Sequence, residues 1–285
     1  MTVELSANRY GKSAVRLFKV VRTTGGLHEI CDLTVDVSLS GDFAAAHVAG
    51  DNSAVLPTDT MKNTVYAKAR EHDLGTPEEF ALLLCRHFLQ AAPPASCASV
   101  VVRQHGWERL ERGGRPHEHA FRRGGEERRV ARVTVHRTGA ASVAAGIEDL
   151  VVLKSAHSAF AGYPKDRYTT LRETSDRILA TSMTVTWQYR DGSRDYRRQF
   201  GDVEQCLLET FAGHESASVQ HTLYAMGAAV LERCRDVEEI SLVMPNRHHL
   251  LADLAPFGLD NPNVIFVPTD APFGLIEATL RRSDR

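Results

Sequence analysis

The feature that most constrains the fold is an order of expected elements that occurs twice along the chain. Alternating apolar residues, turn residues and helix-capping signals predict two strands, two helices and two further strands in each half. In the first half these are strands at 15–22 and 29–39, helices beginning at Thr58 and Thr76, and strands at 98–107 and 128–136. In the second half they are strands at 150–154 and 183–190, helices at 203–212 and 218–233, and strands at 237–244 and 263–267. Runs of strands interrupted by a helix pair favour an α+β, antiparallel architecture over alternating βαβ units.

Local signals mark the starts of the first two helices. Thr76-Pro77-Glu78-Glu79 combines an N-cap, a proline at the first helical position and a glutamate where a capping box requires one. Thr58 is also expected to be an N-cap, with Asp59 in the first turn. An arginine-rich stretch is expected to form a long, solvated connection between the strands at 98–107 and 128–136. The weakly patterned stretch 138–146 predicts the boundary between two domains, 1–140 and 141–285.

The composition argues against several classes of protein. With 285 residues, of which 43% are hydrophobic and 25% charged, the chain resembles an ordinary soluble protein that buries its own core. A net charge of −2 gives no field that would favour nucleic acid or an anionic membrane. The five cysteines lie far apart without zinc-site spacing, which predicts free thiols in a reducing compartment. With no signal-peptide pattern, no membrane-length apolar run and no Ser-Lys-Leu tail, a cytoplasmic location is expected.

Several common catalytic motifs are missing from the sequence. It contains no GxGxxG after an expected strand, no P-loop, no HExxH and no GxSxG. Oxidoreductases built on a nucleotide-binding fold are therefore disfavoured.

Eight short segments, in the same order along most of the chain, resemble the urate oxidase (uricase) family. They are Tyr10-Gly11-Lys12, 58–64, Pro116-His117-Glu118-His119-Ala120-Phe121, 152–155, Tyr168-Thr169-Thr170-Leu171-Arg172-Glu173-Thr174, 176–179, Ser216-Ala217-Ser218-Val219-Gln220 and Pro245-Asn246-Arg247-His248. The resemblance implies two tunnelling-fold domains in tandem, each a four-stranded antiparallel sheet with a helix pair. It also implies a homotetramer around a central tunnel, in agreement with the repeated order of elements.

The resemblance further implies an enzyme of purine degradation. Members of the family oxidise urate with dioxygen and water to 5-hydroxyisourate and hydrogen peroxide. They need no cofactor and no metal, because the electron-rich substrate supplies the electrons itself.

The family's site residues transfer to this chain by motif. The catalytic positions fall on Lys12, Thr58 and His248. The substrate-binding positions fall on Asp59, Phe160, Arg177, Val219, Gln220 and Asn246, and Leu171 lines the pocket. The resemblance implies that each site is shared between two subunits, with the segment containing Thr58 and Asp59 supplied by a neighbour. Around Phe160 the chain reads Ala-Phe-Ala-Gly-Tyr, which matches the family only loosely.

These residue types suit a planar purine anion. The guanidinium fork of Arg177 can form two parallel hydrogen bonds with an edge of the ring and compensate its charge. The amide of Gln220 offers a donor and an acceptor to the pyrimidine edge, and Phe160 offers a stacking face. Helices are expected to begin near Thr58 and Val219, where backbone N–H groups favour an anion.

The catalytic set suits proton transfer. A lysine can act as a base when its surroundings lower its pKa, and a hydroxyl and an imidazole can pass the proton onward, as in a relay of Lys12, Thr58 and His248. Asn246 would hold dioxygen, and then water, above the ring. His248 and His249 are adjacent and would point opposite ways on a strand, so one of the two is expected to be structural.

Two alternatives remain open from the residues alone. His117 and His119 could share one strand face and, with a cysteine, bind zinc in a pterin or purine hydrolase or cyclase of the same fold. The second alternative is a non-catalytic urate-binding protein, against which the joint presence of Lys12, Thr58 and His248 argues.

Overall fold

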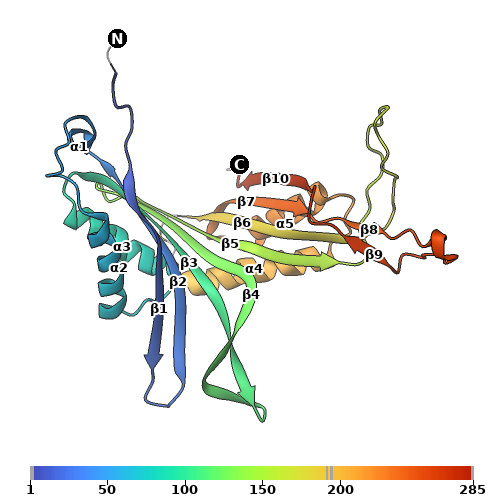
Figure 1. The fold of residues 1–285 in the computed structure, drawn as a ribbon, viewed down its shortest axis with the longest axis horizontal. Helices are drawn as coiled ribbons and strands as arrows, with labels where there is room; N and C mark the ends of the chain where they lie inside the picture. The colour runs from blue at the N-terminus through green and yellow to red at the C-terminus, as the bar shows by residue number, and fades with distance from the viewer. Residues whose placement is uncertain (1–2, 191, 193–194, 284–285) are drawn as a thin grey trace. The chain divides into compact units, whose positions relative to one another are not determined.

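The computed structural model describes residues 3–190, 192 and 195–283. They form two compact units: unit 1 comprises Met1–Gly146 and Asp191–Tyr196, and unit 2 comprises Ile147–Arg190 and Arg197–Arg285. Each unit combines β-strands with a helix pair, so the predicted α+β class is confirmed (Figure 1). The division into domains 1–140 and 141–285 stays a prediction from the sequence. No helix among the described residues is long and apolar enough to cross a membrane.

Unit 1 is built on four neighbouring strands, each antiparallel to the next. In sheet order they are β1 (Tyr10–Arg22), β2 (His28–Gly41), β3 (Ala95–Arg112) and β4 (Arg115–His136). Its helices are the short α1 (Ala44–Val48), α2 (Thr58–Glu71) and α3 (Pro77–Ala91). Figure 1 shows α2 and α3 on the same face of these strands.

The core of unit 1 lies between the strands and the helix pair. On β2 the alternate residues Leu33, Val35, Val37 and Leu39 are at most 2% exposed, which confirms the period-2 pattern. On the helix side, α2 packs against β1 and α3 against β3 and β4, and Val65 and Phe88 of these helices are among the fully buried residues. Burying a large apolar side chain of this kind contributes about 1.5–3 kcal/mol.

The two predicted helix caps have different outcomes. At α3 the capping box is confirmed, because Glu79 N donates to Thr76 Oγ1 at 3.3 Å and Thr76 N donates to Glu79 Oε2 at 2.7 Å. At α2 the prediction for Thr58 is wrong, because Thr58 is the first helical residue. The N-cap is Pro57, which has no side chain that could form a capping hydrogen bond. The hydroxyl of Thr58 is therefore not used to cap the helix.

The expected long connection between the third and fourth strands is also wrong. The strands extend to Arg112 and from Arg115, so that a tight turn at Gly113 and Gly114 joins them. Both glycines have positive φ, at 61° and 73°, as a two-residue type I′ hairpin requires. Side chains towards this turn are mostly exposed, so the stretch is solvated as expected.

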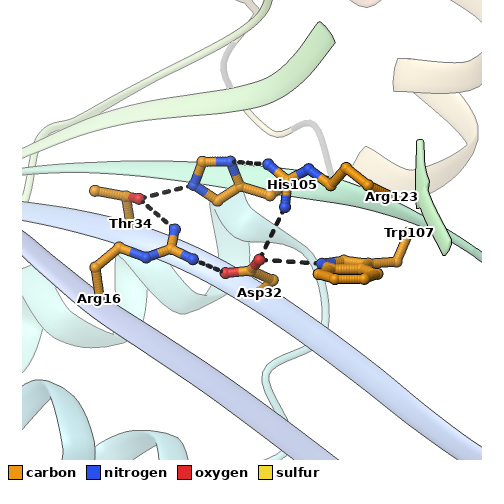
Figure 2. A network of polar contacts seen from close by, with 6 residues as sticks. All are labelled: Arg16, Asp32, Thr34, His105, Trp107 and Arg123. Carbon is orange, nitrogen blue, oxygen red and sulfur yellow. Dashed lines mark hydrogen bonds and ion pairs between the residues drawn. The ribbon is translucent and has the colours of Figure 1, made fainter. Parts of the chain in front are cut away.

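A buried carboxylate connects all four strands of unit 1. Six side chains form the network in Figure 2: Arg16, Asp32, Thr34, His105, Trp107 and Arg123. Asp32 is 3% exposed and accepts hydrogen bonds from Arg16, from Trp107 Nε1 at 3.0 Å and from Arg123 at 3.1 Å. These donors come from β1, β3 and β4, and Asp32 itself lies on β2. Because a buried charge is tolerated when it is paired, the network favours this register of the four strands.

Unit 2 repeats the arrangement of strands and a helix pair, with strand positions that differ in part from the sequence prediction. Its strands, in sheet order, are β5 (Ala141–Lys154), β6 (Leu179–Tyr189), β7 (Val237–Asn246) and β10 (Gly274–Arg281). Its helices are α4 (Tyr196–Gly213) and α5 (Val219–Arg233), and the short helix η1 (Ala255–Phe257) lies between β7 and β10 in the chain. β6 and β10 both pair antiparallel with β7.

The segment expected to be the last strand of this sheet lies elsewhere. Phe266–Pro268 forms β9, which pairs with β8 (His249–Leu251) in a separate two-stranded hairpin. The true edge strand is β10, most of whose residues are exposed, so it lacks the alternation of buried residues by which strands are recognised. Likewise β5 begins at Ala141, within the stretch 138–146 that looked unpatterned in the sequence.

One ion pair is buried inside unit 1. Glu78, in the first turn of α3, is fully buried, and its Oε2 lies 2.8 Å from the guanidinium of Arg129 on β4. Burial raises the pKa of Glu78, and the charge of Arg129 opposes that increase. The carboxylate therefore depends on Arg129 to stay ionised in the folded protein.

We predict that Arg129→Met lowers the free energy of unfolding at pH 7 by about 3–5 kcal/mol, because it leaves a buried charge unpaired. Without Arg129 the folded-state pKa of Glu78 rises further above its unfolded value. The loss of unfolding free energy is then complete at pH values above the folded-state pKa of Glu78. It becomes smaller as the pH falls towards the unfolded-state pKa of Glu78. Urea unfolding at pH 7 and pH 5 checks this, with the double variant Glu78→Gln, Arg129→Met as control. Equal losses at both pH values would contradict it.

Candidate active site

A cavity of about 510 Å³ lies within unit 2, a volume typical of small-molecule sites. The connection between β5 and β6, the end of β7 and the β8–β9 hairpin contribute its walls. Its lining comprises Ser155, Phe160, Leu171, Arg172, Glu173, Thr174, Asp176, Arg177, Ile178, Asn246, His248, His249, Leu250, Leu251, Asn263 and Phe266. Five of the residues predicted for the site or its lining are among them: Phe160, Leu171, Arg177, Asn246 and His248.

Backbone pairing folds the β5–β6 connection so that Phe160 reaches this cavity. Phe160 N donates to Thr174 O at 2.9 Å, and Thr174 N donates to Phe160 O at 3.0 Å. Two residues earlier, Ser158 forms a parallel bridge with Ser216, in the segment before α5. The connection is thus held on both sides, although it contains no helix or regular strand.

Arg177 lies beside the aromatic ring of Phe160. Its guanidinium carbon is 5.3 Å from the ring centroid, within the range of a cation–π contact. The residue is half-buried, and burial lowers the pKa of its guanidinium, which stays charged at neutral pH. Its Nε is buried without a hydrogen-bond partner among the described residues. A partly desolvated guanidinium next to an aromatic ring is well suited to a planar anion.

Asn246 and His248 contribute the polar wall formed by the end of β7. Asn246 is 8% exposed and pairs with Thr181 on β6 and Gly274 on β10, so both neighbouring strands fix its position. His248 follows the strand, and its carbonyl accepts a hydrogen bond from Thr269 N at 2.9 Å.

The neighbouring His249 also lines the cavity. The expected alternation of the two histidines does not apply, because β7 ends at Asn246 and β8 begins at His249, which leaves His248 between the strands. His249 Nδ1 lies 3.2 Å from the carbonyl oxygen of Arg247. His249 therefore has a structural contact and a place on the cavity wall at once.

Val219 and Gln220 begin α5 and are absent from the cavity lining as described. The helix starts near Val219 as predicted, with Ser218 as its N-cap, and Ser218 Oγ accepts a hydrogen bond from His221 N at 3.1 Å. The side chain of Val219 is 3% exposed and belongs to the core, whereas Gln220 is exposed. Any contact of Val219 with a ligand would therefore use its backbone N–H, which the helix leaves without a partner.

Lys12, Thr58 and Asp59 belong to unit 1. Lys12 is half-buried on β1 opposite Val37, next to a β-bulge. Asp59 accepts a hydrogen bond from Lys62 Nζ at 2.6 Å. The pKa of Asp59 is lowered mainly by Lys62, and the charge of Lys12 contributes. Lys12 is thus close enough to the start of α2 for its charge to act there.

The Tyr-Gly-Lys motif has a physical explanation in unit 1. The hydroxyl of Tyr10 accepts a hydrogen bond from Leu56 N at 2.9 Å, which ties β1 to the segment before Thr58. At Gly11 a Cβ atom would lie 1.9 Å from the carbonyl oxygen of Val37, so no larger residue fits. These two neighbours of Lys12 therefore fix its place relative to the start of α2.

Sequence reasoning missed the contribution of the β8–β9 hairpin. Leu250, Leu251, Asn263 and Phe266 line the cavity in addition to the predicted residues. Leu250 and Leu251 are 57% and 49% exposed, and two adjacent exposed leucines directly after the predicted histidine could have signalled a ligand wall.

The zinc alternative requires a set of metal ligands, and the part of the chain that the structure describes contains none. His117 and His119 lie together on β4, with ring centroids 4.9 Å apart. Within residues 3–190, 192 and 195–283, however, no three histidine, cysteine, aspartate or glutamate side chains are grouped so that they could hold a metal ion. All five cysteines are free, as the sequence predicted.

Comparison with known proteins gives one consistent result. The family model described as Uricase matches residues 8–134 and 143–277. The chain is 47% identical to a uricase of Arthrobacter globiformis over 98% of this chain and 90% of that protein, and 37% identical to one of Dictyostelium discoideum over 97% and 96%. The crystal structure of the Arthrobacter globiformis uricase has a TM-score of 0.94 at 46% identity, covering 100% of this chain and 97% of that one. The fold is thus that of the solved uricases, with tunnelling-fold domains in tandem.

We predict that Arg177→Ala weakens binding of urate, the ligand that the family resemblance implies. Charge-assisted hydrogen bonds contribute about 1.5–3 kcal/mol each, so KM and the Kd should rise about 10- to 100-fold, with a smaller change in kcat. Steady-state kinetics and calorimetry measure these quantities. Arg233→Ala, which removes an exposed arginine paired with Glu209, is the matched control. An unchanged Kd in Arg177→Ala would contradict the assignment.

Proposed function

The chain belongs to the uricase family, and we propose that the cavity in unit 2 holds the substrate while Lys12, Thr58 and Asp59 of a neighbouring subunit complete the active site. The protein is a urate oxidase, which converts urate and dioxygen in purine degradation. The observation that carries this conclusion is the match over nearly the whole chain to proteins named uricase. The gathering of Phe160, Arg177, Asn246 and His248 around one cavity supports the assignment of the site.

In the proposed binding mode the purine lies flat in the cavity against Phe160. Arg177 binds one edge of the ring through its guanidinium fork and compensates the negative charge. The amide of Gln220 binds the opposite edge, and the backbone N–H groups at the start of α5 add a favourable dipole for an anion. Support for this mode comes from the contact of Arg177 with Phe160, and from the bridge between Ser158 and Ser216, which links the Phe160 segment to the start of α5.

The proposed chemistry needs one proton relay and no cofactor. Lys12, Thr58 and His248 take a proton from the urate anion and pass it on, a contribution of about 10²- to 10⁴-fold in rate. The electron-rich ring reduces dioxygen to hydrogen peroxide, and water then adds to give 5-hydroxyisourate. Asn246 holds dioxygen and then water above the ring. Urate gives up two electrons and dioxygen accepts them, so that urate, dioxygen and water balance 5-hydroxyisourate and hydrogen peroxide.

A shared site requires an oligomer, and we propose the homotetramer of the family. Large apolar side chains gather in the segment 250–275, where an isolated subunit would expose them to water. Phe257, Val264 and Phe273 are 73%, 66% and 51% exposed. Exposed apolar groups of this density are typical of an association surface.

We predict that protein stripped of metal and cofactor consumes urate and dioxygen in equal amounts and releases hydrogen peroxide. An oxygen electrode, urate absorbance and a peroxide assay measure the three quantities in one reaction. Turnover that begins on addition of zinc would favour the hydrolase alternative, and binding of urate without turnover would favour a non-catalytic binding protein.

We predict that Lys12→Met and Thr58→Ala lower kcat by about 10²- to 10⁴-fold, because each removes a proton-transfer group. Binding of xanthine, a planar purine that lacks the 8-oxo group, should change much less. Lys68→Met, which removes a lysine paired with Glu71 on the same helix as Thr58, is the control. A normal kcat in Lys12→Met would remove Lys12 from the relay.

We predict that subunits carrying Lys12→Met and subunits carrying Arg177→Ala restore activity when they assemble together. If each site combines unit 1 of one subunit with unit 2 of another, random assembly leaves roughly a quarter of the sites intact. Co-expression, followed by size-exclusion chromatography and an assay at urate concentrations well below the raised KM of Arg177→Ala, measures the gain. A monomer with full activity, or no gain in the mixed oligomer, would place the whole site in one chain.

A further inference from the structure

Tyr163 lies directly behind the ring that is proposed to stack on the substrate. Its own ring is stacked on Phe160, with centroids 4.9 Å apart and planes inclined by 15°. Gly162 between them has a φ of 75°, a left-handed conformation that folds the chain back and that glycine adopts without strain. Phe160 lines the cavity, whereas Tyr163 is not among the lining residues described. Because a ring has two faces and Tyr163 covers one, at most one face of Phe160 can stack on a planar ligand.

Tyr163 also contacts the second apolar wall of the cavity. Its hydroxyl donates a hydrogen bond to the carbonyl oxygen of Leu171 at 2.8 Å. Leu171 lines the cavity and is 58% exposed, and no regular element holds its backbone. One side chain thus connects the position of Phe160 with that of Leu171.

An ion pair between Lys165 and Glu173 connects Tyr163 with a further residue of the cavity wall. Lys165 Nζ lies 5.7 Å from the centroid of the Tyr163 ring and 2.9 Å from a carboxylate oxygen of Glu173, which also lines the cavity. The order of contacts is therefore Arg177, Phe160, Tyr163, Lys165 and Glu173. This chain of contacts begins and ends at the cavity wall and runs behind it.

We propose that Tyr163 is a positioning residue for substrate binding, which fixes Phe160 and Leu171 relative to each other and so sets the width of the slot for the purine. The proposal rests on the proposed role of Phe160 as the stacking residue. Tyr163 touches neither the substrate nor the reacting atoms, and its effect on binding passes through the two walls.

The test compares Tyr163→Leu, which removes the stacked ring and the hydroxyl, with Tyr163→Phe, which keeps the ring. Tyr163→Leu should raise the KM for urate and the Kd for xanthine about 3- to 10-fold, the range for loss of one aromatic pair. Its kcat should change less than about 2-fold, because the loss affects bound ground and transition states equally. Tyr163→Phe should show a smaller increase in KM than Tyr163→Leu.

A double-mutant cycle separates action through Phe160 from a general loss of structure. Phe160→Leu should itself raise the KM for urate. In the double variant Phe160→Leu, Tyr163→Leu the KM should be at most about 2-fold higher than in Phe160→Leu alone. Tyr168→Phe removes an exposed hydroxyl, bonded to Arg167, from the same connection and should change neither KM nor Kd. All variants are compared at equal oligomer size and melting temperature, and Tyr163→Met replaces Tyr163→Leu if the latter is insoluble.

The outcomes distinguish the positioning role of Tyr163 from the stacking role of Phe160. If Phe160→Leu raises KM and Tyr163→Leu does not, or if the two changes are additive, Tyr163 has no positioning role. A fall in kcat and stability of Tyr163→Leu at unchanged KM would make Tyr163 merely structural. An unchanged KM in Phe160→Leu would instead overturn the proposed stacking role of Phe160, and the positioning role with it.

Discussion

The arrangement of the candidate site depends on one pair of backbone hydrogen bonds, between Phe160 and Thr174. The connection from β5 to β6 has no helix or regular strand of its own, and its backbone polar groups would otherwise be satisfied by water. The two bonds bring an early and a late part of the connection together. They place Phe160 and Arg177 against the same cavity. The connection ends at Leu179, where β6 begins. The stacked ring of Tyr163 then adds a side-chain contact to the backbone pairing.

Two buried carboxylates in unit 1 are each paired with arginine side chains. Asp32 accepts hydrogen bonds from three strands, and Glu78 is held ionised by Arg129 across the interface between helix and sheet. Neither pair is among the residues described as lining the cavity of unit 2, and the Asp32 network includes Arg16 on β1, the strand that carries Lys12. Such pairs contribute specificity more than net stability, because desolvation offsets much of the Coulomb attraction.

The two groups of site residues have different supports. In unit 2, Asn246 ends a central strand and Arg177 precedes its neighbour, so the sheet itself positions them. In unit 1, Lys12 and the start of α2 are related through the Tyr10 hydroxyl and the close strand approach at Gly11. Each group is ordered within its own unit. The proposed shared site joins the two groups through association of subunits, and the exposed apolar segment 250–275 supports this proposal.

The sequence by itself determined most of the order of elements, the α3 capping box, the start of α5 near Val219 and the family, because these depend on residues near one another in the chain or on short motifs. It also identified Phe160, Arg177, Asn246 and His248, which the structure brings to one cavity. Tertiary structure alone decided that β10, and not residues 263–267, completes the second sheet, because an exposed edge strand carries no burial pattern. It also decided that the Val219 side chain is core, that the β8–β9 hairpin walls the cavity, and that Tyr163 backs Phe160. These depend on contacts between segments distant in sequence or on a local chain reversal, and a one-dimensional pattern of residues does not record them.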